Sequence, residues 1–464
     1  MINWTRRSFF SIHTWWPAAF FLKVWLLSIA ISPAHAAEQL TLADALRLAS
    51  QHNPTIQASR QEIKTALAQY EIARGAFLPR LTATGTYVNT NRPSQAFGIL
   101  LDQGRFTAAD FAINSLNNPG LTENFQSSIR LEQPVYNGGR ELLGIALAEV
   151  GQTVSQEHLE ETRQHMLFQV ATAYYNLALA KVHVGVAKET LDIAKANLRH
   201  ILSRYREGTT VKSDVLHARV RLAAHQEQVV RATQRVAVAQ LRLQHAIGID
   251  EEIDTVETLT GGPLPPLNRQ QLITTALAQR PDYRQLRAEM ARAELAVRLA
   301  QSTFLPSMNL HANYELNATA PFSPNGSNNY AIFGIISLNL FNGLVDMANV
   351  RKAKAQAKKI QHLLEATRRR IEVEVVEASS QLTAAAERLR VTQQAIDEAK
   401  ENLRIVRNRY DTGLASVLEL FTAELILREA KILRLRALYD FHVNRARLDL
   451  VTGKFHQDRE RSSG

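Results

Sequence analysis

Histidine is the residue type that first suggests chemistry, because 14 are present and imidazole is a common metal ligand. His158 with His165, and His217 with His225, can each face one side of a helix. Neither pair has the i, i+4 spacing of helical zinc ligands, so we expect ordinary surface histidines. The sequence also has no GxSxG, HExxH or GxxxxGK[ST] motif. These patterns predict no enzyme, no metal and no cofactor.

The charged residues are interspersed along helical patterns. The chain has 54 Lys and Arg against 44 Asp and Glu, a net charge of +10, and its one tight basic run is Arg368–Arg370. Such spacing is typical of solvated helix faces, so we expect no nucleic-acid partner. Cysteine is absent, which excludes disulfides and thiolate sites and suits an oxidising compartment.

Residues 1–36 have the pattern of a secretory signal peptide. They contain three basic residues, no acid, and a short apolar run over Val24–Ile31. Ala34 and Ala36 are small residues two apart, as at a cleavage site, so the mature chain is expected to begin near Ala37. The alternative is an uncleaved anchor, but the run is shorter than the roughly 20 residues that a membrane span needs.

Proline placement predicts long helices. No proline lies between Pro134 and Pro263 or after Pro324, and the 69 residues between Gly343 and Gly413 contain neither Gly nor Pro. One helix over that stretch is about 100 Å long. Its apolar positions recur in steps of four and three, close to the heptad spacing of a coiled coil. The predicted seam comprises Ile360, Leu364, Thr367, Ile371, Val375, Ala378, Leu382, Ala385, Leu389, Thr392, Ile396, Ala399, Leu403, Val406 and Tyr410.

The chain repeats itself at two fixed offsets, which predicts two copies of one structural unit. Asn53-Pro54 and Phe77-Leu78-Pro79 recur 227 residues later as Arg280-Pro281 and Phe304-Leu305-Pro306. Further matches, 205 residues apart, are Tyr136 with Phe341, Asn137 with Asn342, Gly138 with Gly343, Tyr205 with Tyr410, Gly208 with Gly413, Asp214 with Glu419, and Gly248 with Gly453. The first copy therefore carries a 22-residue insertion between its matched blocks.

These patterns predict five segments. Each repeat should contain a short helix, two strands and two long helices joined by a turn. The expected bounds are a signal peptide at 1–36, a first repeat at 37–248, a linker at 249–267, a second repeat at 268–453, and a disordered polar tail at 454–464.

Four segments alternate apolar and polar residues, as half-buried strands do. Each is roughly 10 residues long, the length with which a tilted strand crosses a bilayer. His311 lies on the polar face and would point into a barrel lumen, where it could tune conductance. The residues expected to face lipid are Leu81, Tyr87, Ile129, Leu131, Met308, Leu310, Tyr314, Ile336 and Leu338.

Four strands cannot close a barrel, and open strand edges are not tolerated in lipid. Because the smallest bacterial barrels have about 8 strands, other copies of the chain must complete the sheet. The alternative is a soluble sheet that lies against the helices.

The N-terminal motif over Leu40–Leu46, followed by Asn53–Ile56, resembles the opening of the outer membrane efflux proteins, the TolC-like channel tunnels. The duplicated Phe-Leu-Pro, the Asn-Gly after each second strand, and Tyr-x-x-Gly followed six residues later by an acid fit this family as well. The resemblance covers about residues 38–453.

The resemblance implies a mainly α fold with membrane β structure. Three chains would share a 12-stranded outer-membrane barrel that continues into a periplasmic α-helical barrel. Such a trimer is the passive exit duct of a tripartite efflux or type I secretion system, docked to a periplasmic adaptor and an inner-membrane transporter that supplies the energy. Residues 91–122 and 319–328 would be extracellular loops. Lacking an acylated cysteine, the chain would depend on the barrel for anchorage in outer-membrane lipid.

In relatives the helix-helix turns form the periplasmic entrance and the adaptor-docking tip. The resemblance makes Asp214 and Glu419 candidate acidic gate residues, with Tyr205 and Tyr410 as their hydrogen-bonding partners. The candidate docking turns comprise Gly208, Thr209, Thr210, Gly413, Leu414, Ala415 and Ser416. Both turn glycines suit the left-handed conformation that ends a helix.

Each acid has a structural alternative. Ser416 and Glu419 have the spacing of a capping box, and Asp214 lies where acids favour the first turn of a helix. Ala415 and Thr422 depart from gates that are built on an arginine and paired acids, so we expect a weaker latch. The competing function is a soluble periplasmic coiled-coil scaffold or adaptor without a pore.

Overall fold

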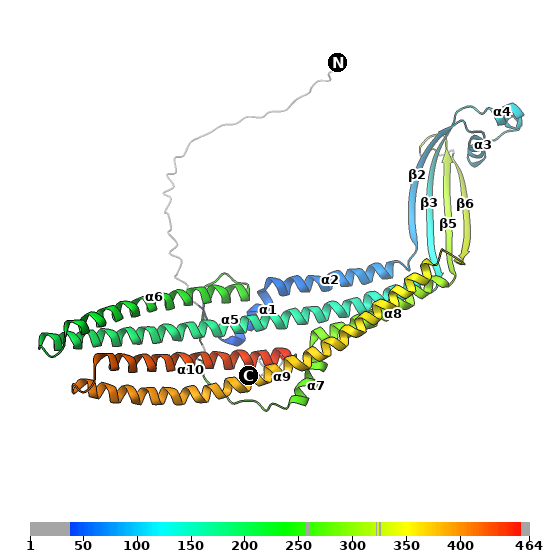
Figure 1. Cartoon of the computed structure of the whole chain (residues 1–464). Helices are drawn as coiled ribbons and strands as arrows, with labels where there is room; N and C mark the ends of the chain where they lie inside the picture. The colour runs from blue at the N-terminus through cyan, green and yellow to red at the C-terminus, as the bar shows by residue number, and fades with distance from the viewer. Residues whose placement is uncertain (1–37, 257–258, 322, 324–325, 456–464) are drawn as a thin grey trace, which may run out of the picture.

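The computed structural model describes residues 38–256, 259–321, 323 and 326–455 and shows an elongated helical body with a β-sheet at one end (Figure 1). Four long helices form two hairpins whose turns lie at the opposite end. Helices α5 and α9 each have 67 residues, about 100 Å of helix. The single helix predicted between the two glycines is confirmed. The long helices are α5 (Arg140–Arg206), α6 (Lys212–Ile247), α9 (Val345–Asp411) and α10 (Val417–Val451).

The apolar seam of α9 is where the sequence places it. All the buried residues of this helix except Asp346 are seam positions. Three of the nine are alanine, and such small side chains let the helix axes approach closely at these positions. The buried seam residues are Ile371, Val375, Ala378, Leu382, Ala385, Ile396, Ala399, Leu403 and Tyr410.

Two pairs of shorter helices lead from the body towards the sheet (Figure 1). In each pair the first helix ends just before a proline, and Pro54 or Pro281 then begins the second helix. Proline lacks a backbone N–H, but at the first position of a helix that N–H has no partner within the helix, so its absence costs no hydrogen bond. A short 3-10 helix, η2 (Ser302–Phe304), follows the second pair. The pairs are α1 (Leu42–His52) with α2 (Pro54–Gly75), and α7 (Arg269–Gln279) with α8 (Pro281–Gln301).

The sheet has four antiparallel strands in the order β2-β3-β5-β6, and a bulge lies between Pro134 and Tyr136. The register pairs Leu81 with Leu131 and Met308 with Ile336, so the predicted apolar positions within the strands share one face. The prediction for Leu338 is wrong in one respect, because β6 ends one residue before it. The strands are β2 (Arg80–Thr90), β3 (Thr122–Asn137), β5 (Ser307–Ala318) and β6 (Ser327–Ser337).

The segment 91–122, predicted as an extracellular loop, contains helical structure beyond the end of the sheet (Figure 1). The buried side chain of Gln103 holds this segment against the sheet by donating hydrogen bonds to the carbonyls of Glu123 and Ala318. The second predicted loop is shorter than expected, because β6 begins at Ser327. The helices of segment 91–122 are α3 (Pro93–Asp102), the 3-10 helix η1 (Ala108–Phe111) and α4 (Ile113–Asn117).

A small parallel sheet pairs β1 (Glu38–Leu40), the first described residues, with β4 (Ile253–Thr255) in the predicted linker. Three-residue strands are too short to show a period in the sequence. The predicted disordered tail also begins too early, because Phe455 is buried in the main core and packs edge-on against Phe168. Its large apolar ring gains more from burial than the polar residues after it would. The predicted signal peptide and residues 456–464 lie outside the described part of the chain.

None of the described helices combines the length and the apolar character needed to cross a membrane.

Candidate functional site: the hairpin tips and the strand face

Both hairpin turns use a glycine with positive φ, 73° at Gly208 and 79° at Gly413, as predicted. At the first turn the N–H of Gly208 donates to the carbonyl of Tyr205 at 3.2 Å, and that of Thr209 to the carbonyl of Arg204 at 2.9 Å. The second turn repeats both bonds 205 residues later. This is a Schellman motif, which satisfies the last carbonyls of the helix and needs a left-handed residue. The two predicted docking turns therefore have one backbone geometry.

The acid of the second turn serves the helix cap. The N–H of Glu419 donates to the hydroxyl of Ser416 at 3.2 Å, and the N–H of Ser416 donates back to the Glu419 carboxylate at 3.0 Å. The backbone N–H of Ser416 lowers the pKa of Glu419 below its usual value. The capping-box interpretation is confirmed, and a gate role for Glu419 stays a prediction.

The acid of the first turn has a different partner. Asp214 accepts a hydrogen bond from the hydroxyl of Thr210 at 2.6 Å, while Val211 occupies the N-cap position and offers no side-chain oxygen. Within the part of the chain that the structure describes, hydroxyls of neighbouring residues hold both acids. The predicted hydrogen bonds from the tyrosines to these acids are not seen there.

The two tyrosines of the repeat lie in different environments. Tyr410 is only 6% exposed, and the guanidinium of Arg204 lies 5.0 Å from its ring centre and donates to its carbonyl at 3.0 Å. Burial raises the pKa of the Tyr410 phenol, and the charge of Arg204 acts against it. Tyr205, by contrast, is 43% exposed. The first hairpin thus supplies a cation to the tyrosine of the second.

Sequence reasoning missed a second cation–aromatic contact between the hairpins. The guanidinium of Arg221 lies 4.4 Å from the ring centre of Phe421 and donates to its carbonyl at 2.8 Å. Contacts of this kind between a cation and a ring stabilise by about 0.5–2 kcal/mol. A role for Arg204 could have been suspected from the sequence, because an Arg-Tyr pair occurs at both turns, as Arg204-Tyr205 and Arg409-Tyr410. Arg221 had none, because its match in the second repeat is Ile426.

The sheet has one apolar and one largely polar face. Large side chains on the apolar face are exposed, and the rings of Tyr87 and Phe125 lie 4.6 Å apart on it. The other face carries polar pairs such as Asn124 with Asn317, 2.8 Å apart. His311 lies on this face as predicted, stacked on the ring of Phe333 at 5.3 Å. Strands β2 and β6 each pair on one side within the described sheet.

Comparison with known proteins decides the family. The outer membrane efflux protein family model matches residues 45–249 and 272–454, most of the chain. The chain belongs to this family. It is 24% identical over 404 residues to protein CyaE of Bordetella pertussis, with 84% of this chain and 79% of that one covered. It is 24% identical to the alkaline protease secretion protein AprF of Pseudomonas aeruginosa, with 89% and 84% covered.

The fold of this efflux protein matches solved structures of outer-membrane channels. The crystal structure of the Campylobacter jejuni CmeC outer membrane channel superposes with a TM-score of 0.76 at 18% identity, covering 91% of this chain and 88% of that one. The family, the fold class and the outer-membrane location predicted from the sequence are confirmed. Membership of the outer membrane efflux protein family favours the channel over the scaffold.

Among the described residues of this efflux protein, no group of three or more potential metal ligands occurs. The expectation of surface histidines is wrong for His225, which is 5% exposed and lies 3.2 Å from the side-chain oxygen of Gln228. Burial lowers the pKa of the His225 imidazole below its usual value. His158 lies on the surface between Glu62, at 3.7 Å, and Glu161, at 3.8 Å.

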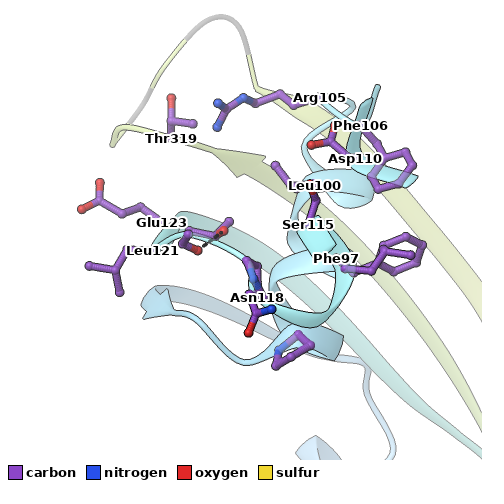
Figure 2. Close-up of a pocket in the computed structure, with 15 residues that line it drawn as sticks. Phe97, Leu100, Arg105, Phe106, Asp110, Ser115, Asn118, Leu121, Glu123 and Thr319 are labelled. Atoms are coloured by element: carbon purple, nitrogen blue, oxygen red, sulfur yellow. Dashed lines mark hydrogen bonds between the residues drawn. The ribbon is translucent and has the colours of Figure 1, made fainter. Parts of the chain in front are cut away.

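A cavity of about 500 Å³ lies between the helical loop and the ends of the strands (Figure 2). Figure 2 shows Phe97 and Leu100 on the helical side and Glu123 at the start of β3. Phe106 packs edge-on against Phe97 at 4.9 Å and so gives this wall a rigid aromatic part. The rest of the lining mixes charged, polar and apolar groups, with no arrangement that favours a particular ligand.

Proposed function

We propose that three copies of this efflux protein form a passive channel-tunnel, the exit duct of a tripartite efflux or type I secretion system. Each copy contributes four strands to a 12-stranded barrel in the outer membrane. The long hairpins of all three line a tunnel through the periplasm. An inner-membrane transporter supplies the energy, and the chain itself carries out no chemical step.

The observation that carries this proposal is the exposed apolar face of the sheet. In the isolated chain Leu81 is 67% exposed, Ile332 68% and Ile336 72%. A contiguous apolar surface of this kind marks contact with lipid or protein. The strands have 11 to 16 residues, enough to cross a bilayer with tilt. Neighbouring copies would pair with the free edges of β2 and β6 and so remove the edges that lipid does not tolerate.

The tips are proposed as the periplasmic entrance and the adaptor-docking site. They lie at the end of the molecule opposite the sheet (Figure 1), and the longest helices between them have 67 residues, about 100 Å. The two turns present the same backbone shape, so one adaptor surface could bind either. Tyr205, Asp214, Tyr410 and Glu419 would form the gate. Because both acids are held by local hydroxyls, the latch is expected to be weak.

Native mass spectrometry of protein extracted by detergent from outer membranes tests this proposal. We expect a trimer. The variant Ile332→Arg places a charge at mid-strand on the apolar face and should cost about 2–4 kcal/mol per copy if that face contacts lipid. Ala331→Arg is the matched control, because the register puts its side chain on the opposite face. The control should assemble and Ile332→Arg should not.

Two outcomes would contradict the channel. A monomer or dimer recovered from the soluble periplasmic fraction would favour the scaffold. Equal assembly of both arginine variants would show that the apolar face does not contact lipid.

A further inference from the structure

Two adjoining cavities form a groove along the first hairpin, between α5 and α6. One, of about 290 Å³, is lined by both helices and also by Arg428 and Ile432 of α10, which belongs to the second hairpin. The other, of about 430 Å³, is lined by α5 and α6 alone. His183 and Arg235 line both cavities, so the two lie side by side there. The groove therefore runs from the contact between the two hairpins along the first one.

The charged residues that line this groove are almost all basic. Arg231, Arg235 and Arg242 lie on α6, which rises about 16 Å from the first of them to the last, and Arg428 lies on α10. Among the described residues of the lining, the one acid is Glu227, and it already pairs with Arg231. In the described part of the chain, no ion pair neutralises the other three guanidinium groups. The groove therefore carries uncompensated positive charge.

The side chain of Arg428 is incompletely satisfied by the protein. One of its terminal nitrogens donates to the side-chain oxygen of Gln228 at 3.4 Å. Its Nε atom is buried and, among the described residues, has no hydrogen-bond partner. Burying a donor without an acceptor is unfavourable, because the donor loses its hydrogen bonds to water. The site thus favours a ligand that brings an acceptor oxygen.

The imidazole of His183 responds to the same positive charge. Burial lowers the pKa of His183, and the nearby charges of Arg235 and Arg436 lower it further. Arg436 lies on α10, so cations from both hairpins act on this side chain. His183 is therefore neutral near pH 7, and its ring can donate a hydrogen bond without adding to the charge.

The second hairpin shows which group the groove lacks. His183 matches Arg388 and Arg235 matches Asp440, each 205 residues later. Arg388 and Asp440 form an ion pair at 3.3 Å. In the first hairpin a cation stands in place of Asp440, and among the described residues of the lining no free carboxylate takes its role. The same backbone arrangement thus holds a cation and an anion in one hairpin and two basic side chains in the other.

We propose that this groove binds a small anion, a polycarboxylate or a phosphate compound, between the two hairpins of one chain. One acidic group of the ligand binds Arg235 and takes the place that the Asp440 carboxylate has in the second hairpin. Another of its oxygens accepts a hydrogen bond from Nε of Arg428. The planar guanidinium group is suited to both ligand classes, because its donors match the paired oxygens of carboxylates and phosphates.

The size and the place of the groove favour a small ligand. A volume of about 290 Å³ is close to the lower end of the roughly 300–1,000 Å³ that small-molecule pockets span. The lining comes from one chain, so the site does not require contact between copies. Because Arg428 belongs to the second hairpin and Arg235 to the first, a bound anion links the hairpins and should stabilise the protein against thermal unfolding. This inference goes beyond the proposed channel, which requires no ligand.

Isothermal titration calorimetry of the detergent-extracted protein tests the site, with citrate and inorganic phosphate as separate probes. The ionic strength is held constant with sodium chloride, so that general screening of charge is the same in every titration. We expect saturable binding of at least one probe, and a thermal unfolding midpoint that rises with its concentration. Stronger binding of citrate would identify a polycarboxylate as the ligand class, and stronger binding of phosphate would identify a phosphate compound.

The variant His183→Arg/Arg235→Asp gives the first hairpin the ion pair of the second. Its new carboxylate occupies the place of the ligand, so the affinity should fall by roughly tenfold or more. Arg219→Gln is the matched control, because each variant lowers the net charge by one and Arg219 lies outside the groove. Since Arg219 precedes Arg235 by sixteen residues on α6, its side chain points to about the opposite side of the helix. The control should bind as the wild type does.

Arg428→Met tests the link to the second hairpin. It removes the Nε donor and should weaken binding by roughly tenfold. Unchanged binding in this variant, or in His183→Arg/Arg235→Asp, would overturn the proposal. The absence of saturable binding for both probes would overturn it as well. So would an equal loss of affinity in Arg219→Gln, which would show that the anions only screen the charge of the protein.

Discussion

Asn53 and Arg280 occupy the same place in the two halves of the chain, just before the proline that begins the second short helix. The side chain of Asn53 accepts hydrogen bonds from the N–H groups of Thr55 and Ile56 and donates to the carbonyl of Ala246. It therefore caps one helix and ties it to the end of another with neutral hydrogen bonds.

Arg280 secures the matching joint with charge. Its guanidinium bonds the carboxylate of Asp282 at 2.7 Å and that of Glu374 on α9, and its side chain is only 12% exposed. Arg370 also approaches Asp282, at 3.3 Å. The repeat thus preserves the backbone path while the residues that hold it differ completely. The two halves share one backbone shape. We expect their two joints to differ in how strongly substitution and pH change the stability of the protein.

The largest expected effect is that of Arg280→Ala. Removing the guanidinium leaves two partly buried acids with only the more exposed Arg370 beside them, at 3.3 and 3.6 Å, which should cost about 3 kcal/mol of unfolding free energy. Asn53→Ala, the matched change in the first half, removes a cap and one further hydrogen bond and should cost about 1–2 kcal/mol. Denaturant unfolding in detergent, followed by circular dichroism, measures both. Equal losses would show that the two joints are held with similar strength.

Acid should reduce the difference between these two joints. Burial opposes the ionisation of Asp282, but the hydrogen bond and charge of Arg280 outweigh it and hold the pKa of Asp282 below its ordinary value. A lowered pKa in the folded state stabilises the fold above the unfolded pKa, and this stabilisation is lost as pH falls through the folded pKa.

We therefore expect the difference in unfolding free energy between the wild type and Arg280→Ala to narrow in acid, because protonation of Asp282 removes the charge that Arg280 stabilises. The gap between the wild type and Asn53→Ala should stay constant. Unfolding midpoints measured over a pH series check both expectations. A constant gap for Arg280→Ala would show that its effect is one of packing.

The smallest expected effect is at the hairpin tips, where one turn has a side-chain cap and the other does not. Ser416→Ala should destabilise by about 1 kcal/mol, because it removes a hydroxyl that accepts a hydrogen bond from the helix N-terminus. Val211→Ser should stabilise by up to about 1 kcal/mol, since it supplies the missing cap at the equivalent position. Thermal unfolding of the two variants against the wild type measures this. Destabilisation by Val211→Ser would mean that the valine packs at the tip.

The strand face could be predicted because period-two alternation is a local property. Leu81, Ile129 and Tyr314 each show it within their own segment, and the register then places them together. Leu338 was misplaced because alternation continues past the last ladder hydrogen bond of β6. The sheet of β1 and β4 was missed because two three-residue strands far apart in sequence have no period to detect.

The sequence by itself determined the long helices, the left-handed turn glycines, the duplicated unit and the family. Each of these depends on the spacing of residues within one segment or on a fixed offset between two. Only the tertiary structure decided that Tyr410 is buried while Tyr205 is exposed, and that Arg221 lies over Phe421. The two tyrosines have the same local sequence pattern, and what separates them is whether another hairpin of the chain covers them. Contacts between residues about 200 positions apart are set by how the helices pack, and no local pattern contains that information.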